Sequence, residues 1–180
     1  IFMLEERSMK HLLEGLLPRL FPGLEFQCIP HEGKRDLEKS LPRKLRSWRE
    51  PGARFVVLRD QDSEDCHTLK SRLVALAAEA GRPDTLVRLA CRELEAWYLG
   101  DPAALAEAFR IENLRGLGDK ARYRDPDRLP HPSKELARLV PEYQKIAGAR
   151  VLAEHLEPER NCSRSFQVLL ESLRALQAAR

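Results

Sequence analysis

Long hydrophobic runs are absent from this sequence, and their absence excludes a membrane-spanning helix. Uninterrupted apolar stretches are only a few residues long, such as FVVL at residues 55–58 and VALAA at residues 74–78, whereas a span needs about 20 apolar residues. No secretory signal is visible either. The sequence begins at Ile1 inside an apolar run, so we expect a few residues of the first strand to precede the printed numbering.

Paired cysteines are also missing. The four cysteines stand far apart, with no C-x-x-C and no Cys/His group of zinc-ligand spacing, at Cys28, Cys66, Cys91 and Cys162. This spacing argues against a disulfide framework and against a zinc site, and it favours a protein of the reducing cytoplasm. The five histidines are scattered and support no Ser-His-Asp arrangement.

A strong charge of either sign is lacking, because 31 Lys and Arg residues against 28 Asp and Glu residues give a net charge of +3. Such a mild excess permits a nucleic-acid partner without requiring one. Much of the excess is local, since residues 34–50 hold seven basic residues against three acidic ones. A hydrophobic content of 43% fits a single globular domain.

Segments with strand-like and helix-like patterns alternate through the first hundred residues. Apolar or alternating runs predict strands at residues 1–4, 24–29, 54–60 and 85–91. Helical spacing of apolar residues predicts helices between them, at residues 9–20, 34–49 and 69–80. Such alternation predicts an α/β fold with a mainly parallel sheet of about four strands flanked by helices.

The rest of the chain has a different pattern. We expect a short helix at residues 102–109, a long loop or lid over residues 113–132, and helical segments around residues 136–140 and 166–176. Residues 1–101 would then form the α/β core, and residues 102–180 a loop and helical C-terminal extension of the same globular domain. Pro42 should start, kink or split the helix at 34–49.

Acidic residues follow three of the predicted strands. Asp60 and Asp62 stand where the most apolar strand turns polar, and alternation in an extended chain would project both carboxylates to one side. Since ligands of parallel sheets gather at the carboxyl ends of the strands, these acids predict a site for a hard divalent cation. The alternative is that Asp62 or Ser63 caps the helix beginning near Glu64.

Two further groups of acids are placed at the same edge. Glu5 should lie at the mouth of the sheet, whereas Glu6 is expected simply to open the following helix. Glu93 is the favoured outer carboxylate after the fourth strand, where it would bind a second cation or fix a basic group. Glu95 is the weaker candidate for that role, and Trp97 should fill the core.

Basic side chains surround Tyr123 in the predicted loop, at Lys120, Arg122, Arg124 and Arg128. A basic loop facing an acidic metal centre would suit a phosphate backbone. Scattered surface charge explains the same residues equally well.

The segments LEERSM, VVLRDQD and RELEAWYLGD resemble a known family. Together with the alternating topology they are similar to the TOPRIM domain of topoisomerases, DnaG-type primases and the overcoming-lysogenization-defect nucleases. More closely, they resemble an uncharacterised bacterial TOPRIM-like family catalogued as domain of unknown function 4276. The resemblance covers residues 1–101 at motif level and is looser at residues 145–148 and 165–166.

The resemblance implies a nuclease that uses Mg²⁺ or Mn²⁺. It makes Glu5 the family's glutamate, Asp60 and Asp62 its metal-binding aspartate pair, and residues 93–97 the signature that contains Glu93 and Glu95. It also implies Lys145 as a catalytic lysine, and by analogy an ATPase partner and a role in bacterial phage defence. Relatives often carry a glycine after the first glutamate and an acid four positions after that glutamate, where this chain has Glu6 and Met9. That departure weighs against a second metal near the first strand.

Three functions therefore compete. The favoured one is metal-dependent phosphodiester hydrolysis of DNA or RNA, with the basic segments 34–49 and 113–134 holding the strand. A non-catalytic regulatory or partner-binding module is the second. A receiver-type phosphoacceptor ranks last, because it needs a Ser or Thr after the fourth strand, where this chain has Cys91, Arg92 and Glu93.

Overall fold

The computed structural model describes residues 1–178, and within them one sheet of four parallel strands forms the centre of the molecule. The strands are β1 (Phe2–Leu4), β2 (Cys28–Pro30), β3 (Val56–Asp60) and β4 (Leu86–Ala90). Their order across the sheet is β2-β1-β3-β4, and all three pairings are parallel. The prediction of a mainly parallel, four-stranded α/β sheet is thereby confirmed.

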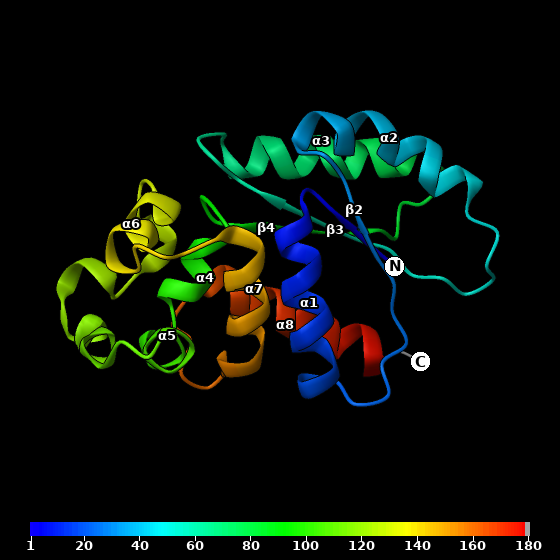
Figure 1. Ribbon diagram of the computed structural model, residues 1–180. Helices are drawn as coiled ribbons and strands as arrows, with labels where there is room; N and C mark the ends of the chain where they lie inside the picture. Colours follow the sequence, from blue (N-terminus) through cyan, green and yellow to red (C-terminus); the bar gives the residue numbers. More distant parts are fainter. Residues whose placement is uncertain (179–180) are drawn as a thin grey trace.

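Helices connect the strands and form most of the second half of the chain (Figure 1). The three crossover helices are α1 (Arg7–Leu20), α2 (Lys34–Ser47) and α3 (Cys66–Glu79). After β4 come α4 (Glu95–Leu99), α5 (Pro102–Phe109), α6 (Pro132–Leu139), α7 (Lys145–His155) and α8 (Arg164–Ala178). Between residues 1 and 178 no helix combines the length and the apolar character that crossing a membrane would require.

The two faces of the sheet have different covers. Met3, Val57 and Val87 face α2 and α3 and pack in one hydrophobic cluster with their leucines. The alternate residues on the other face, among them Leu4 and Leu58, belong to a larger cluster that includes α1, α4, α5, α7 and α8. Figure 1 shows α2 and α3 above the sheet and α1, α7 and α8 below it. The larger cluster joins the first hundred residues to the helices that follow them.

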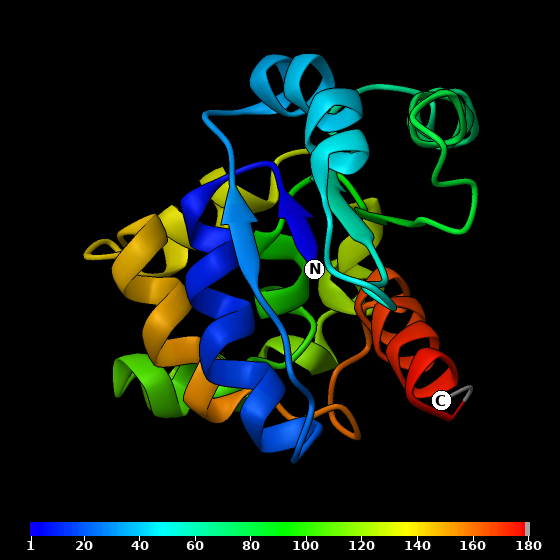
Figure 2. The same ribbon diagram turned by 90° about the vertical axis from the view of Figure 1, so that its right-hand side faces the viewer.

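Helices α1 and α7 lie side by side although they are far apart in the sequence (Figure 2). A Cβ atom added at Gly15 of α1 would lie 2.6 Å from the Cβ atom of Ala153 of α7. Only a residue without a side chain allows this approach. The contact holds the last part of α7 against α1, the helix that follows β1, and so fixes the position of the helix that begins at Lys145.

Two local predictions were wrong, and the prediction for Pro42 was wrong in two of its three alternatives. The strand predicted at 24–29 is confined to Cys28–Pro30, because β2 pairs only with the three residues of β1. Pro42 neither starts nor splits the basic helix, since α2 runs without a break from Lys34 to Ser47. The helix after β3 is capped by Asp65, whose carboxylate accepts the backbone N–H of Thr68 at 2.8 Å.

The stretch predicted as a loop or lid is folded. It forms three short 3₁₀ helices, η1 (Glu112–Asp119), η2 (Ala121–Tyr123) and η3 (Pro126–Arg128). Its irregularly spaced apolar residues are buried in the larger cluster, at Leu114, Leu117, Tyr123 and Leu129. The sequence did not predict these helices, because short 3₁₀ turns produce no extended periodic spacing of apolar residues.

Candidate functional site

Two of the predicted acids lie at the point where the order of the strands reverses. From β1 the chain crosses to β2 on one side, and from β2 it crosses back to β3 on the other side. In open α/β sheets ligands bind in the crevice at this switch point. Glu5 follows β1 and Asp60 ends β3, and the backbone N–H of Asp60 donates to Oε2 of Glu5 at 3.1 Å. The fold therefore joins these two acids where a ligand is expected.

Asp60 is a buried carboxylate with an unsatisfied oxygen. The residue is 6% exposed, and within residues 1–178 its Oδ1 atom has no hydrogen-bond partner. Burial raises the pKa of Asp60 well above its ordinary value, and the negative charges of Glu5, Glu6 and Glu95 raise it further. Lys145 opposes these effects. An ionised Asp60 would therefore need another positive charge beside it.

Glu95 is a second carboxylate of this kind. It is 1% exposed at the start of α4, its Oε1 accepts a hydrogen bond from the hydroxyl of Tyr143 at 3.0 Å, and its Oε2 has no partner among the residues that the structure describes. Burial raises its pKa, while the nearby Lys145 opposes that increase. Trp97 fills the core as predicted and donates its Nε1–H to Ser165 at 2.8 Å. That bond and the buried bulk of α4 fix the helix that carries Glu95.

Lys145 supplies the positive charge on this side of the sheet. As the first residue of α7 it places Nζ 3.3 Å from Oε2 of Glu6 and 4.0 Å from Oε1 of Glu95. Burial lowers its pKa, but the carboxylates of Glu95, Glu6 and Asp60 outweigh that effect and raise the pKa above its ordinary value. The lysine indicated by the resemblance thus lies among the acids that the strands present.

We call Glu5, Glu6, Asp60 and Glu95 the acidic cluster. Sequence reasoning placed Glu6 only at the opening of a helix. Glu6 does stand at the N-cap of α1, but its side chain caps no backbone N–H group of that helix. Instead it accepts hydrogen bonds from the hydroxyl of Ser8 and the ammonium group of Lys145. Glu6 was therefore missed, because its position before a helix already had a sufficient explanation.

Two tyrosines beside the acidic cluster were also missed. Tyr98 is fully buried with no partner for its hydroxyl, and its pKa is raised by burial and then by Glu95, Glu6 and Asp60. Tyr143 reaches Glu95 because Gly148 leaves room for its ring, where an added Cβ would lie 2.4 Å from Cε2. The glycine inside α7 was the only sequence signal for this packing.

Asp62 does not accompany Asp60. The strand ends at Asp60, and Asp62 has φ 55°, so the alternation that would place both carboxylates on one side stops between them. Its carboxylate pairs with Lys34 at the start of α2 at 2.7 Å and is 33% exposed. The expectation that the two aspartates converge through extended backbone was therefore wrong for this structure.

Glu93 has a structural partner. Its Oε2 accepts the backbone N–H of Ser133, in the first turn of α6, at 2.7 Å. Of the two candidate acids after β4, it is Glu95 that is buried among the other carboxylates. The sequence favoured Glu93 because it is closer to the strand, but a tight turn at Arg92, with φ 62°, separates the strand from both acids.

Arg59 joins Glu5 to the opposite face of the sheet. Its side chain is 1% exposed, pairs with Glu38 and Glu64, and places Nε 3.6 Å from Oε2 of Glu5. Burial raises the pKa of Glu5 to about 7, and the guanidinium of Arg59 limits that increase. Arg59 therefore holds Glu5 at the switch point and partly compensates its charge.

Comparison with known proteins places this chain in a family. The family described as Domain of unknown function (DUF4276) matches residues 4–174. The chain belongs to this family. No curated protein and no solved structure matches it. The DUF4276 match includes all members of the acidic cluster and also Lys145, so the acids and the lysine belong to one homologous unit.

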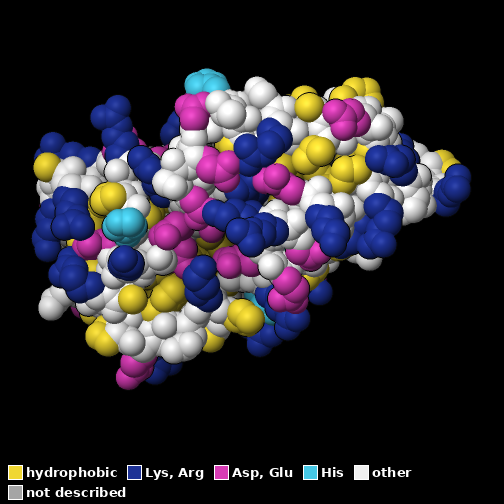
Figure 3. All heavy atoms as spheres, turned by 90° about the horizontal axis from the view of Figure 1, so that it is seen from above, with side chains coloured by type: hydrophobic (Ala, Val, Ile, Leu, Met, Phe, Trp, Pro, Cys, Tyr) yellow, Lys and Arg dark blue, Asp and Glu magenta, His cyan; other side chains and the backbone are white. Residues whose placement is uncertain are grey.

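The surface of this DUF4276 protein has mixed charge. Figure 3 shows acidic and basic side chains interspersed around the middle of one face rather than in separate areas. Several residues of the basic segments are paired, as Lys34 is with Asp62, Arg122 with Glu135, and Arg128 with Asp125. A cavity of about 540 Å³ lies at the other edge of the sheet, beside Phe2 and Val56 at the amino ends of β1 and β3.

The donor chemistry of the acidic cluster suits a hard cation. Between residues 1 and 178 no three His, Cys, Asp or Glu side chains are arranged to hold a metal ion by themselves. Mg²⁺ often needs fewer, since it keeps several waters and binds one or two carboxylates together with substrate phosphates. The unpartnered oxygens of Asp60 and Glu95 are carboxylate ligands of that type. On this ground the residues present fit Mg²⁺ or Mn²⁺.

Proposed function

We propose that this protein is a metal-dependent phosphodiesterase that cleaves nucleic acid. One observation carries the proposal. Two carboxylate oxygens of the acidic cluster, Oδ1 of Asp60 at the switch point and Oε2 of the nearby Glu95, are buried and have no hydrogen-bond partner within residues 1–178. Leaving buried polar atoms unsatisfied costs about 1–3 kcal/mol each, and a cation that binds there would offset this cost.

The residues of the cluster would divide the work. Asp60 and Glu95 would hold Mg²⁺ or Mn²⁺, and Glu5 would contribute through its contact with the Asp60 backbone. When bound, such an ion polarises a phosphate and lowers the pKa of a water molecule. Lys145 would neutralise a phosphate oxygen of the substrate once its pairing with Glu6 is exchanged for that contact. Tyr143 would keep Glu95 oriented. Asp62 stays a predicted ligand of the ion, and it can reach the ion only if its bond to Lys34 opens.

The resemblance to TOPRIM nucleases supports the same reaction, because it assigns Glu5, Asp60 and Lys145 to metal binding and catalysis. By that analogy a DNA or RNA substrate, an ATPase partner and a role in phage defence in the cytoplasm belong to the proposal. The support for the substrate, the partner and the role in phage defence is the resemblance of the sequence motifs.

Cleavage by the purified protein tests the proposal. Labelled single-stranded and double-stranded DNA and RNA would be incubated with the protein in Mg²⁺, in Mn²⁺ and in EDTA. We expect cleavage of at least one substrate with either ion and none in EDTA, since the cluster lacks enough positive charge of its own. Cleavage at the same rate in EDTA would contradict a metal-dependent mechanism.

One observation favours the second candidate function, a non-catalytic partner-binding module. Lys145 already pairs with Glu6 and lies near Glu95, and Arg59 pairs with acids on the other face. In such a module these cations would be permanent partners of the acids. The protein would then cleave no substrate with any ion, alone or together with a partner ATPase.

A further inference from the structure

A hollow that we call the basic hollow lies outside the acidic cluster, between η2, residues 129–131 and α6. Its volume is about 210 Å³, and its lining combines the apolar Leu129 and Pro130 with Arg122, His131, Lys134, Glu135 and Arg138. Its three Lys and Arg side chains face one carboxylate, which leaves a charge of +2 when His131 is not counted. A hollow of this charge and size suits a small anionic group.

A buried carboxylate holds the two arginines in place. Glu135 is 6% exposed, and its two oxygens accept Nη2 of Arg122 and Nη2 of Arg138, each at 2.6 Å. The hydroxyl of the buried Tyr123 donates to the same carboxylate. Burial acts to raise the pKa of Glu135, but its bonds to Arg138 and Tyr123 outweigh this effect and lower it, so the carboxylate is charged at neutral pH. Both guanidinium groups are therefore fixed before any ligand arrives.

Each of these arginines retains unused donors. In the described part of the chain, Nε and Nη1 of Arg122 and of Arg138 make no hydrogen bond. The side chains of Arg122 and Arg138 are 59% and 62% exposed, so these nitrogens are open to a ligand. Lys134 is exposed, and it too has no partner within residues 1–178. Planar guanidinium donors together with a free ammonium group are typical of phosphate binding.

The basic hollow is connected to the acidic cluster. Ser133, beside Lys134 in α6, donates its backbone N–H to Glu93, two residues before Glu95. Helix α6 lies next to α4, the helix that carries Glu95 (Figure 1). A chain of phosphates that reaches the acidic cluster could therefore place another of its phosphates in the hollow.

We infer that the basic hollow binds a backbone phosphate of the nucleic acid whose cleavage is proposed above. This inference rests on the proposed function. It adds the residues that bind the substrate at a phosphate other than the one that is cleaved. Lys134, Arg122 and Arg138 supply the contacts, and Glu135 positions the two arginines. Contacts to phosphate fix the position of a nucleic acid without reading its sequence, so the hollow binds strands of any sequence.

Binding without cleavage tests the inference. The full chain would be titrated into a fluorescently labelled single-stranded oligonucleotide in EDTA at several salt concentrations, with anisotropy as the readout, for DNA and RNA separately. We expect Lys134→Ala and Arg122→Ala each to weaken binding about threefold to tenfold. Each should also reduce the slope of log affinity against log salt by about 0.7, the value for one phosphate contact to a single strand.

A matched control is Lys70→Ala, which removes from α3 an exposed lysine that has no partner among the described residues. This variant should bind as the wild type does. Because Lys134 has no partner in the described part of the chain, its variant should keep the fold even if that of Arg122 does not. Wild-type affinity and salt slope in Lys134→Ala, or no binding by the wild type, would overturn the inference. If the hollow instead binds an acidic protein partner, Lys134→Ala would bind the oligonucleotide as the wild type does, and the inference would be overturned.

The two proposals can fail separately. If the wild type binds through Lys134 but cleaves nothing with Mg²⁺ or Mn²⁺, the hollow stands and the nuclease is refuted. If the wild type cleaves and Lys134→Ala binds normally, the nuclease stands and the hollow is refuted.

Discussion

Replacing Asp60 by asparagine should abolish metal-dependent cleavage while the protein stays folded. Asparagine has nearly the same shape but no charge, so the variant removes the carboxylate that the account places at the ion. A metal ligand contributes several kcal/mol to catalysis, and each 1.4 kcal/mol is a factor of ten in rate. We therefore expect cleavage to fall roughly 100-fold to 1,000-fold. Rates in Mn²⁺ with the best substrate would provide the measurement.

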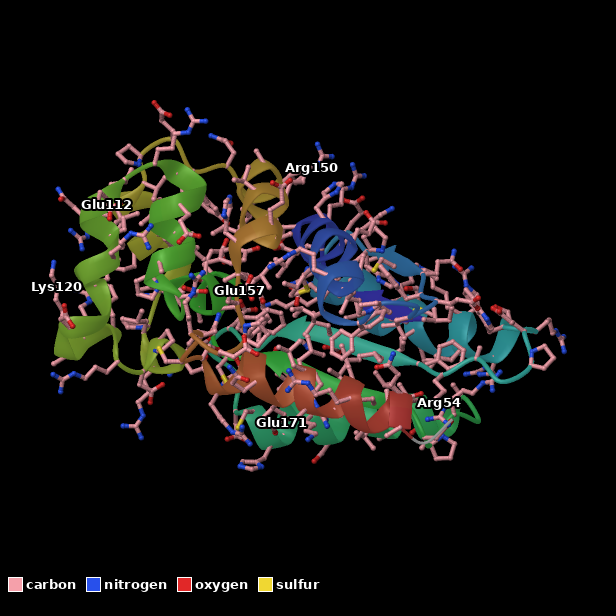
Figure 4. All side chains as sticks on the ribbon, turned by 90° about the horizontal axis from the view of Figure 1, so that it is seen from below. Arg54, Glu112, Lys120, Arg150, Glu157 and Glu171 are labelled. Carbon is pink, nitrogen blue, oxygen red and sulfur yellow. The ribbon has the colours of Figure 1, made fainter. Side chains whose placement is uncertain are left out.

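Three further variants make the result specific. Glu95→Gln should lose cleavage to a similar degree, because its free oxygen is the other proposed ligand. Asp62→Asn should lose less, since that carboxylate is partly exposed and paired with Lys34. Glu112→Gln should cleave like the wild type, because this exposed acid pairs with Arg115 and is not a member of the acidic cluster; Figure 4 shows it near one end of the molecule. Equal rates in the wild type and Asp60→Asn would refute the assignment.

Stability without metal should fall as the pH rises through neutrality. The pKa of Glu5 is raised in the folded protein from 4.5 to about 7, and that of Asp60 is raised as well. Between the unfolded and folded pKa values the folded state binds more protons, so its stability decreases with increasing pH. One pKa unit corresponds to about 1.4 kcal/mol, so Glu5 alone would account for a loss of up to roughly 3 kcal/mol between about pH 5 and pH 8.

Urea denaturation in EDTA at a series of pH values measures this effect. Asp60→Asn should be more stable than the wild type at about pH 8 and should show a weaker pH dependence, because a neutral amide replaces a buried charge. Added Mg²⁺ should stabilise the wild type at that pH and leave the variant nearly unchanged. Glu112→Gln should follow the wild type under all conditions. A wild type that gains stability from pH 5 to pH 8 would contradict the burial of these carboxylates.

The sheet was predictable because its signals are local. Apolar runs mark β1, β3 and β4, and alternation with helices implies parallel strands. Glu5 and Asp60 follow directly from this reasoning, since both stand where a strand ends. Strand β2 is shorter than its sequence pattern predicts. Its length is set by pairing with the three residues of β1 and not by the residues of β2 themselves.

The rest of the acidic cluster depends on contacts between distant segments. Glu95 belongs to the acidic cluster and Glu93 does not, because of how α4 packs. Helix α4 follows a turn at Arg92, and the spacing of apolar residues does not predict this turn. Tyr143 reaches Glu95 because Gly148 inside α7, distant from Glu95 in the sequence, leaves room for its ring. Lys145 came from the resemblance alone, because a lysine at the start of a late helix has no local signal.

Asp62 belongs to the D-x-D spacing, but the geometry predicted from that spacing was wrong. The D-x-D spacing predicts convergence only while the backbone remains extended. The strand ends at Asp60, and the positive φ of Asp62 turns its carboxylate to Lys34. A single dihedral angle after the strand therefore decided which residues of the motif share the site.

A crystal structure of the protein soaked with Mn²⁺ is the most direct test of the central claim. The account predicts an anomalous peak within about 2.5 Å of carboxylate oxygens of both Asp60 and Glu95, with Lys145 displaced from its present position. A map with no peak at the acidic cluster, and with Lys145 still paired with Glu6, would contradict it.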